Sequence, residues 1–431
     1  MAAETDRKIP EQETPISPAL ESRPLISRKL LLFMVAMVLA NTGGNMYGPL
    51  LPLYLKSLNA SVIQIGLFFT LSQVIPLALQ ILGGWISDSL GRLRSIAMGS
   101  VAGVFSYLGL ILAPTWQWVL VGEGLSSVTR SLVGPSFSAF IAEESAEESR
   151  ARVFGITETI FMIVGVVGPP LGGWLADIYG FRIMLVVAGG LYLIATIIRV
   201  AMARSAAKTK EASPQKLSVI SLKRDLGLMV TMIMAGGLVT WILFTDGVRD
   251  VAYLMSFTLI PVYLQDLGGL SIQQIGWLES IFGIFMMLTT IPSGWLADRK
   301  GDRVPIALGF LIEFLAMMTF IRVSTFIGYA IAWAMFGLGV GLMSPAYQSL
   351  ISKAVPEKMR GTAFGFFETS LGLVSLPAPW IGAQLWERVS PRFTFTITAW
   401  AGLLAIIPVW FKFKLPENTR QANAEQESTS N

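Results

Sequence analysis

The chain of 431 residues contains no cysteine and no histidine. Without cysteine it has no disulfides and no thiolate metal sites, and without histidine any proton transfer near neutral pH must use carboxylic acids. Most catalytic arrangements that pair a nucleophile with a base, or that use a metal ion, are therefore unavailable. We expect a protein that is not an enzyme and that needs no cofactor or metal ion.

Charge is also scarce, because charged residues make up 14% of the chain and hydrophobic residues 53%. A soluble protein has about 25% charged residues. The charges gather in short clusters, and the apolar stretches between them are about 20 residues long, the length that crosses the hydrocarbon core of a bilayer. The composition predicts an all-α membrane protein, and its slight excess of positive charge does not indicate nucleic acid as a partner.

Twelve apolar stretches predict twelve transmembrane helices. They are residues 30–55, 62–86, 95–113, 117–141, 153–175, 182–203, 236–264, 272–296, 304–323, 325–351, 362–385 and 393–411. The seventh apolar stretch is longer than one span needs, so its helix is expected to begin near residue 226 or near residue 236. Dividing this stretch into two spans would move every later loop to the other side of the membrane.

Lysine and arginine indicate how the chain is oriented. With the N-terminus inside, about 25 of them fall in cytoplasmic tails and loops and about 5 outside, which is the bias of cytoplasmic loops. Only Arg130 and Arg249 are counted within spans. We expect a multi-pass protein of the plasma (cytoplasmic) membrane with both termini in the cytoplasm. The expected units are a disordered tail at 1–28, six-helix bundles at 29–203 and 236–412, a cytoplasmic linker at 204–235 and a tail at 413–431.

Internal repeats relate the two halves of the chain. LPLYLKSLNASVIQIG at 51–66 recurs as IPVYLQDLGGLSIQQIG at 260–276, and RARVFGITET at 150–159 recurs as RGTAFGFFET at 360–369. A shorter similarity, between GGWISDSLGR and GGWLADIYGF, lies within the first half. Three-helix units repeated within each half are typical of secondary transporters.

The loops after the second and eighth spans carry the clearest motif. GWISDSLGRL at 84–93 and GWLADRKGDR at 294–303 match G-x-L-A-D-R-x-G-R-K, with Ser89 and Asp302 in place of arginine. This is the cytoplasmic loop signature of the major facilitator superfamily, which the chain resembles over about residues 30–412. The resemblance implies two pseudo-symmetric six-helix bundles that work by alternating access, with helices 1, 4, 7 and 10 lining a central cavity.

The resemblance also assigns a cytoplasmic gate to these loops. It implies that Asp298 reaches the start of helix 5, and that Asp88 reaches the start of helix 11, when the cavity faces outward. Glu158 and Glu368 are repeat-equivalent and suggest an inner cap, although a solvated position at the interface fits them equally well. The predicted gate residues are Asp88, Gly91, Arg92, Asp298, Gly301, Arg303, Glu158 and Glu368.

The fifth span contains a second motif. Gly168, Pro169, Gly172 and Gly173 match G-P-x-x-G-G, a signature of the drug–proton antiporters within that superfamily. A further glycine usually stands four residues before the first of these, where this chain has Val164. The alternative is a structural role, because glycine and proline let membrane helices bend and pack closely.

Ionisable side chains within the spans are candidates for transport, because an ionisable group in hydrocarbon is costly. Asp246, Arg249 and Asp250 share one helix face and can form ion pairs. In helix 4 the family's arginine position falls near Glu123, and Arg130 lies seven residues later on the same face. We expect one acid among Glu123, Asp246 and Asp250 to take up and release a proton. A self-neutralising structural triad is the alternative for the three residues of helix 7.

Several uncharged side chains are predicted to line the cavity. Asn41 and Asn45 share one face of helix 1, and aromatic residues of helices 7 and 10 can stack on a cationic or aromatic substrate, with core packing as the alternative. These aromatic residues are Trp241, Tyr253 and Trp333. Two further acids have no predicted transport role: Glu279, expected near the outer surface, and Glu313, on a helix expected to be peripheral.

The favoured function is proton-coupled export of a small lipophilic or cationic compound. Uptake of a metabolite such as a sugar or an organic acid with protons, and lipid translocation, remain open, because a fold does not determine a substrate. A receptor or assembly chaperone on the same scaffold is less favoured, because the charges of the cavity are present. The expected partners are the bilayer, a small-molecule substrate and protons, and the protein is expected to be a monomer.

Overall fold

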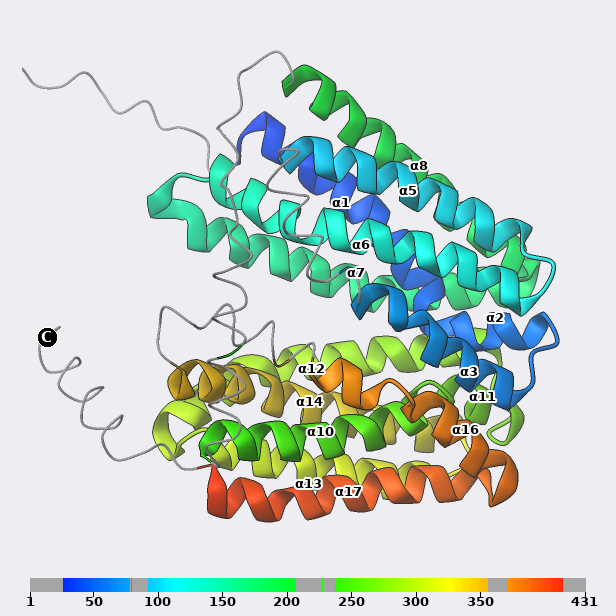
Figure 1. Cartoon of the computed structure of the whole chain (residues 1–431), viewed down its shortest axis with the longest axis vertical. Helices are drawn as coiled ribbons and strands as arrows, with labels where there is room; N and C mark the ends of the chain where they lie inside the picture. The colour runs from blue at the N-terminus through cyan, green and yellow to red at the C-terminus, as the bar shows by residue number, and fades with distance from the viewer. Residues whose placement is uncertain are drawn as a thin grey trace, which may run out of the picture.

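The computed structural model describes residues 26–77, 79, 92–206, 227, 237–355, 367 and 370–413. Within these residues the regular structure is helical, and the helices form an N-terminal half and a C-terminal half (Figure 1). Most of the predicted tails and of the predicted linker, together with Asp88, Gly91 and Glu368, lie outside the described residues.

The described helices of the N-terminal half come from residues 28–206. They are α1 (Arg28–Tyr47), η1 (Gly48–Leu50), α2 (Leu51–Ser57), α3 (Val62–Ser72), α5 (Arg92–Leu112), α6 (Trp116–Glu144), η2 (Glu147–Ser149), α7 (Arg150–Tyr179) and α8 (Phe181–Ala206).

The described helices of the C-terminal half come from residues 238–412. They are α10 (Leu238–Phe257), α11 (Ile260–Asp266), α12 (Ile272–Lys300), α13 (Arg303–Phe320), α14 (Phe326–Ala354), α16 (Ala378–Arg388) and α17 (Pro391–Lys412). Each of the twelve predicted spans contains a described helical segment. The start of the seventh span lies outside the described residues, so that choice stays open.

Eight helical stretches of the described residues are long and apolar enough to cross a membrane. Two other long helices, α6 with 29 residues and α10 with 20, are too polar to meet the same criteria. These are the helices that carry the predicted transport charges. These two helices are more polar because they carry ionisable groups at membrane depth. A helix bundle tolerates such groups where they face its interior.

The two halves repeat each other in local structure. A proline stands in the first turn of α2, the short helix that continues the first span, and another stands in the first turn of α11, which continues the seventh span. Proline fits this position because its missing N–H would be unpaired in a first turn in any case. Ser61 with Gln64, and Ser271 with Gln274, form capping boxes at the starts of α3 and α12. The sequence repeat is therefore also a repeat of helix starts and breaks.

The halves contact each other at the end of the molecule that carries the 58–61 and 267–271 turns, here called the closed end. There α7 packs on α12, and α3 packs on α16. A Cβ added at Gly276 would lie 2.5 Å from the Pro169 carbonyl oxygen, and one added at Gly66 would lie 2.5 Å from the Pro379 carbonyl oxygen. The same close approach of helices is thus used twice, once on each side of the pseudo-symmetry axis.

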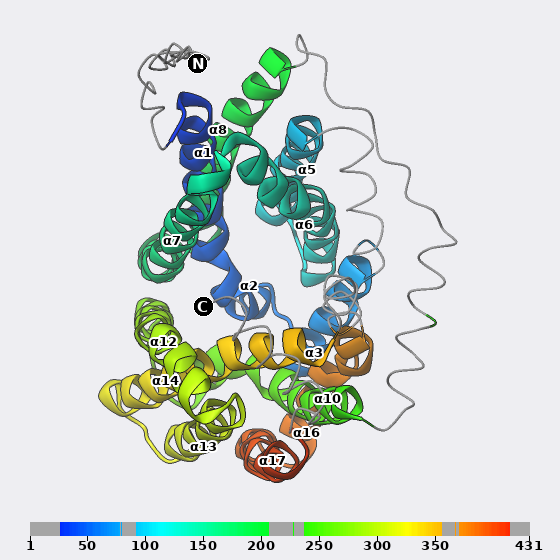
Figure 2. The ribbon, with the colours of Figure 1, turned by 90° about the vertical axis from the view of Figure 1, so that its left-hand side faces the viewer.

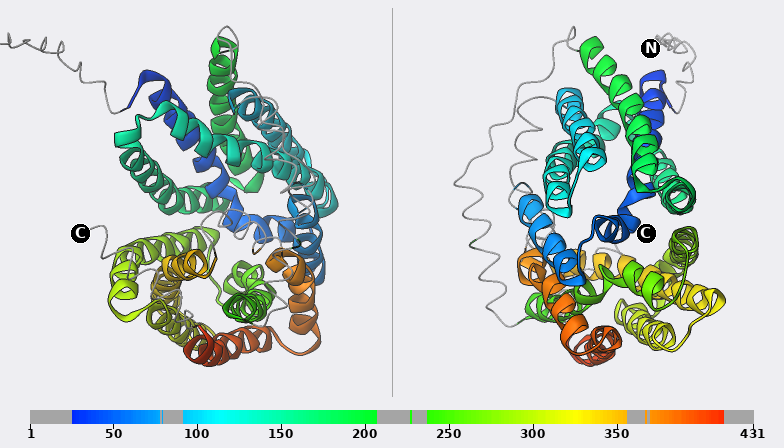
Figure 3. Two further views of the ribbon diagram at one scale, coloured as in Figure 1. Left: turned by 60° about the vertical axis from the view of Figure 1, so that its left-hand side comes forward. Right: turned by 90° about the vertical axis from the view of Figure 1, so that its right-hand side faces the viewer.

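The opposite end of the molecule, here called the open end, carries the Asp298 loop and the start of α7. The largest apolar core contains residues of both halves near the closed end, whereas toward the open end each half has a core of its own. In Figure 1, α7 and α12 diverge toward the open end, and Figures 2 and 3 show the two groups of helices from further sides. The molecule is therefore joined at one end, and its polar cavities lie within each half.

Candidate substrate site

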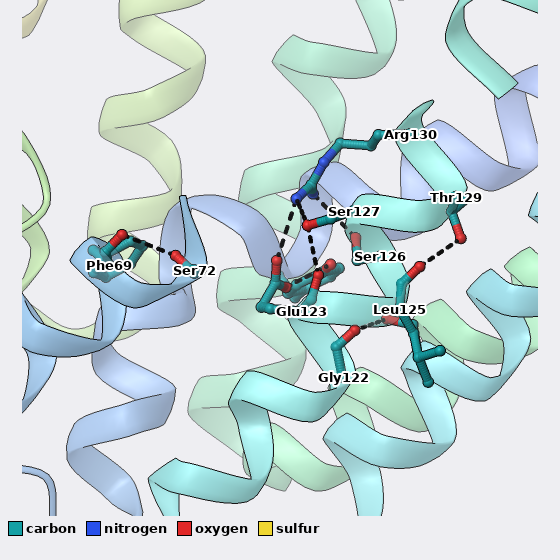
Figure 4. A network of polar contacts seen from close by, with 11 residues as sticks. Phe69, Ser72, Gly122, Glu123, Leu125, Ser126, Ser127, Thr129 and Arg130 are labelled. Carbon is teal, nitrogen blue, oxygen red and sulfur yellow. Dashed lines mark hydrogen bonds and ion pairs between the residues drawn. The ribbon is translucent and has the colours of Figure 1, made fainter. Parts of the chain in front are cut away.

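The N-terminal half contains a cavity of about 560 Å³ lined by α1, α5, α6, α7 and α8. Glu123 on α6 is 7% exposed and lies in this cavity. Its Oε2 is 3.6 Å from Nη2 of Arg130, and its Oε1 accepts a hydrogen bond of 3.3 Å from the Tyr47 hydroxyl. Figure 4 shows the Arg130 side chain reaching back along α6 toward Glu123 and Ser127. The seven-residue spacing, two turns of helix, brings the two charges together.

The C-terminal half contains a similar cavity of about 570 Å³, lined mainly by α10, α13 and α14. Arg249 stands between two acids, with its Nη2 3.1 Å from Oδ1 of Asp246 and 3.1 Å from Oδ1 of Asp250. The guanidinium carbon lies 5.7 Å from the centre of the Tyr347 ring. The three charges of α10 therefore pair as their spacing predicts, and they do so at the wall of a cavity.

Glu313 on α13 lines the same cavity, although the sequence offered no role for it. Gly339 of α14 allows this approach, because a Cβ added there would lie 2.9 Å from Cγ of Glu313. Among the described residues Glu313 has no ion pair within 4.0 Å. The cavity thus holds three carboxylates and one arginine. One feature of the sequence could have indicated this position for Glu313. It is a single acid in an otherwise apolar helix, and such an acid has to face the protein rather than lipid.

Arg199 on α8 is a second charge that sequence reasoning misplaced. It was counted with the cytoplasmic cations, because it stands near the end of its predicted span. In the structure it is 3% exposed and lines the N-terminal cavity together with Glu123 and Arg130. Arg199 reaches this cavity because α8 packs directly on α1 and α5, which form part of the cavity wall. Hydropathy alone does not reveal which neighbours cover the end of a helix.

Three of the predicted lining residues do not line either cavity. Asn45 packs on Gly168 of α7 and donates to the carbonyl oxygen of Asn41, whereas Asn41 itself lines the N-terminal cavity. Trp333 is 3% exposed in the closed-end core and donates to Oε1 of Glu279 at 3.4 Å. Glu279 is therefore held within the protein at the closed end. Asn45 and Trp333 therefore serve helix packing. For Trp333 this is the alternative to substrate stacking that the sequence leaves open.

Trp241 is the third of these residues, and it is partly buried beside the C-terminal core. With Thr245 and Val248 it forms one helix face, which lines an apolar groove between α10 and α17. The acids of α10 lie on a different face of the same helix. Tyr253 does line the C-terminal cavity, and its ring stacks on Phe257 with the centroids 4.7 Å apart.

Where the structure describes them, the predicted gate residues make no contact across the two halves. Asp298 on α12 and Glu158 on α7 are both exposed. Gly301 has a φ of +83°, which ends α12 in a backbone conformation that favours glycine. Arg303 donates to the Trp410 carbonyl oxygen at 3.0 Å, inside its own half. The predicted contacts belong to a conformation closed at this end, so the latch stays a prediction.

The helix 5 motif acts in packing at the closed end. A side chain at Gly172 would collide with the carbonyl oxygen of Met46 on α1, and a Cβ at Gly173 would lie 2.8 Å from the carbonyl oxygen of Ile272. The repeat-equivalent Gly382 approaches the carbonyl oxygen of Met255 in the same way. The motif therefore lets α7 contact α1 and α12 at the same level, where the two halves join.

Comparison with known proteins identifies the family. The family model described as Major Facilitator Superfamily matches residues 33–268 and 247–430. The chain belongs to the major facilitator superfamily. Its fold is accordingly the major facilitator fold, and it is a membrane-spanning transporter rather than an enzyme. Among the described residues, no group of three or more carboxylates is placed to hold a metal ion.

The relatives of this transporter include efflux pumps and an antiporter, in agreement with a resemblance to the drug–proton antiporter branch. It is 22% identical over 401 residues to a multi-drug resistance efflux pump PmrA homolog of Lactococcus lactis, covering 90% of this chain and 95% of that protein. It is 26% identical to a Na(+), Li(+), K(+)/H(+) antiporter of Planococcus maritimus, covering 92% and 98%. The crystal structure of a point mutant of the nucleoside transporter NupG matches with a TM-score of 0.74 at 13% identity, over 90% of this chain and 100% of that one. At this identity the structural likeness shows the fold.

Proposed function

We propose that this transporter exports small lipophilic or cationic compounds in exchange for protons by alternating access. The observation that carries the proposal is the excess of carboxylates in the C-terminal cavity. Asp246, Asp250 and Glu313 line it with Arg249 as the one arginine among its described lining residues. Carboxylates therefore outnumber cations by two in this described lining, in a wall that is otherwise largely apolar and aromatic.

An excess of buried carboxylates has two ways to reach neutrality. Burying an uncompensated charge costs several kcal/mol, so the cavity favours either protons on the acids or a cation beside them. A proton and a cationic compound then compete for the same groups, which is the requirement for exchange. The rings of Tyr253 and Tyr347 line the same cavity and offer a cation–π surface to the compound.

Glu123 of the N-terminal cavity is a second group that can carry a proton. It is buried beside Arg130 and Tyr47 and has no described contact with the acids of the other half. Protonation of Glu123 would release Arg130 from its ion pair. This group therefore links proton uptake to the charge state of the N-terminal cavity.

The orientation is part of the proposal. The distribution of lysine and arginine supports a plasma membrane protein with both termini in the cytoplasm. The open end then faces the cytoplasm, because it carries the ends of α5, α12, α14 and α17 with Arg92, Lys300, Lys353 and Lys412. Both cavities are then placed to receive a compound from the cell interior. The protein is proposed to act as a monomer.

The names of the relatives support export and exchange. One is a multi-drug resistance efflux pump homolog and another is an antiporter of alkali cations and protons. The first name describes efflux of drugs and the second describes antiport of alkali cations and protons, which suits a cavity rich in carboxylates. The G-P-x-x-G-G match in α7 points in the same direction.

Flux in proteoliposomes tests the proposal. Tetramethylrhodamine methyl ester, a lipophilic cation, is the probe, and pH gradients of either direction are imposed. Exchange predicts that dye moves against the direction of proton flow, whereas uptake with protons predicts that both move together. Flux that is the same with and without a gradient contradicts proton coupling.

Two variants test which acids take part. Asp250→Asn and Glu123→Gln each remove one candidate proton carrier while keeping the shape of the side chain. We expect at least one of them to lose gradient-driven flux while the protein remains folded. Full gradient-driven transport by both would exclude these two acids as carriers.

A further inference from the structure

Arg199 is a buried cation without a counter-ion in the described residues. It is 3% exposed, and its Nη1 donates to the Ser100 hydroxyl at 3.0 Å. Within the described part of the chain, its Nε has no hydrogen-bond partner and no carboxylate forms an ion pair with it. A buried guanidinium without an anion is costly, so an anionic group at this point would be strongly favoured.

The other charges of the N-terminal cavity do not meet this need. The cavity is lined by Glu123, Arg130 and Arg199, and Glu123 is already paired with Arg130. One carboxylate and two arginines leave one positive charge. The C-terminal cavity, with three carboxylates and one arginine, has the opposite excess. The two halves therefore present cavities of opposite sign.

The Tyr192 hydroxyl adds a second donor to the same place. It is 8% exposed, lines the N-terminal cavity, and has no hydrogen-bond partner among the described residues. Tyr192 and Arg199 are seven residues apart on α8 and so share one face. The ring fits because Gly103 of α5 has no side chain, and a Cβ there would lie 2.5 Å from the ring. The cavity wall thus combines a guanidinium with a hydroxyl group on the same helix face.

We propose that Arg199 and Tyr192 form a subsite for a carboxylate, and that the transported compounds are amphoteric. The acidic group of the compound binds in the N-terminal cavity, and its cationic group is attracted by the carboxylates of the C-terminal half. A guanidinium suits a carboxylate because its parallel N–H groups match the two oxygens. This inference rests on the proposed function and narrows the class of compound.

A pair of dyes that differ in one group tests the subsite. Tetramethylrhodamine is a zwitterion with a free carboxylate, and its methyl ester is a cation with the same ring system. Fluorescence polarisation with the purified full-length protein measures the affinity for each. We expect the free acid to bind about tenfold more tightly than the ester, which corresponds to about 1.4 kcal/mol.

Substitution of the arginine should remove that preference. Arg199→Gln is expected to weaken binding of the free acid about tenfold and to leave binding of the ester unchanged. The matched control is Arg204→Gln, because Arg204 is an exposed arginine on the last turn of the same helix. Its dye affinities should equal those of the wild type. Equal affinity of the wild type for both dyes, or an equal loss of both in Arg199→Gln, would overturn the proposal.

Tyr192→Phe provides a second variant if Arg199→Gln does not fold. It removes one hydroxyl and keeps the ring, and it should weaken the free acid about threefold without changing the ester. If folded Tyr192→Phe binds the free acid and the ester with the wild-type ratio of affinities, the role of the hydroxyl is overturned. If Arg199→Gln is also unfolded, the same result overturns the subsite as a whole. Gradient-driven flux of the ester is measured in parallel. Absence of gradient-driven ester flux in the wild type contradicts the proposed function. Gradient-driven flux together with equal affinity for the two dyes contradicts the subsite alone.

Discussion

Asp302 forms a salt bridge with Lys353, whose Nζ lies 3.1 Å and 3.0 Å from the two carboxylate oxygens. Arg92 and Glu143 form the equivalent ion pair in the other half, at 3.3 Å. Both residues of each pair are related by the repeat, since 302 − 92 and 353 − 143 both equal 210. The departure of Asp302 from the loop signature is thus matched by a lysine on α14, and the contact is kept with its charges exchanged.

The exchange of charges makes a direct prediction for stability. Asp302 is 5% exposed, so Asp302→Asn leaves Lys353 without its partner and should lower the free energy of unfolding by about 2 kcal/mol. The double variant Asp302→Arg with Lys353→Glu reproduces the N-terminal pair and should recover most of the loss. Thermal melting in detergent measures both. Glu148→Gln, at an exposed acid, is the control. A double variant no more stable than Asp302→Arg alone would contradict this account.

The bridge between Lys56 and Asp266 should stabilise the closed end. Lys56 on α2 pairs with Asp266 on α11 of the other half and also donates to Gln265 at 3.0 Å. Both charges are partly exposed, so the bridge contributes about 0.5–1 kcal/mol and Lys56→Gln should shift the conformational equilibrium about two- to fivefold. The chain has no cysteine, so spin labels at Ser57→Cys and Leu267→Cys report the distance across this end.

The control for that experiment is Arg322→Gln, because Arg322 is exposed in the turn after α13 and its described hydrogen bond goes to the Met318 carbonyl oxygen of the same half. The distance distribution should lengthen in Lys56→Gln and stay unchanged in the control. Identical distributions in the wild type and Lys56→Gln would show that the bridge does not hold the two halves together.

Gly172 is predicted to tolerate no side chain where α7 packs on α1. A Cβ there would overlap the Met46 carbonyl oxygen, which is backbone and cannot move aside as a side chain can. Gly172→Ala should therefore lower the melting temperature, because α7 can no longer approach α1 as closely. Gly165→Ala is a matched control on the same helix, since its Cβ would meet its nearest described neighbour at 4.0 Å. Equal effects of the two substitutions would show that the close approach is unimportant.

Glu313 should take part in the competition between protons and a cationic compound. Because both bind carboxylates, the affinity of the wild type for tetramethylrhodamine methyl ester should rise as pH rises. Glu313→Gln removes one carboxylate from the cavity and should weaken the dye about tenfold and flatten its pH dependence. Glu387→Gln, at an exposed acid, should bind dye as the wild type does. A pH dependence that is unchanged in Glu313→Gln would place the competition on other acids.

Asp298 should act on turnover rather than on binding. In this structure Asp298 is exposed. Its predicted contact with the start of α7 forms only in the other conformation, in which the two halves meet at the Asp298 end. Asp298→Asn should therefore slow flux and leave the dye affinity unchanged, because the cavities are lined by other residues. Lost dye binding in a folded protein would contradict a role in the latch.

The sequence determined the features that depend on local pattern. The length of an apolar run determines whether it can span a bilayer, so helical segments occur in all twelve predicted spans. Spacing along one helix determines which side chains share a face, so Asp246, Arg249 and Asp250 form ion pairs, and Glu123 meets Arg130. The repeat predicted two related halves because equivalent prolines and capping residues break and start helices at equivalent places.

The tertiary structure decided which faces point inward and what surrounds each charge. Glu313 reaches the C-terminal cavity because Gly339 on the neighbouring helix leaves room for it, and Arg199 is buried because α8 packs on α1 and α5. Trp241 lines the groove between α10 and α17, although its helix also carries the acids. Such outcomes depend on the packing of helices that are distant in sequence, and helical periodicity alone does not distinguish the inner face of a peripheral helix from its lipid face.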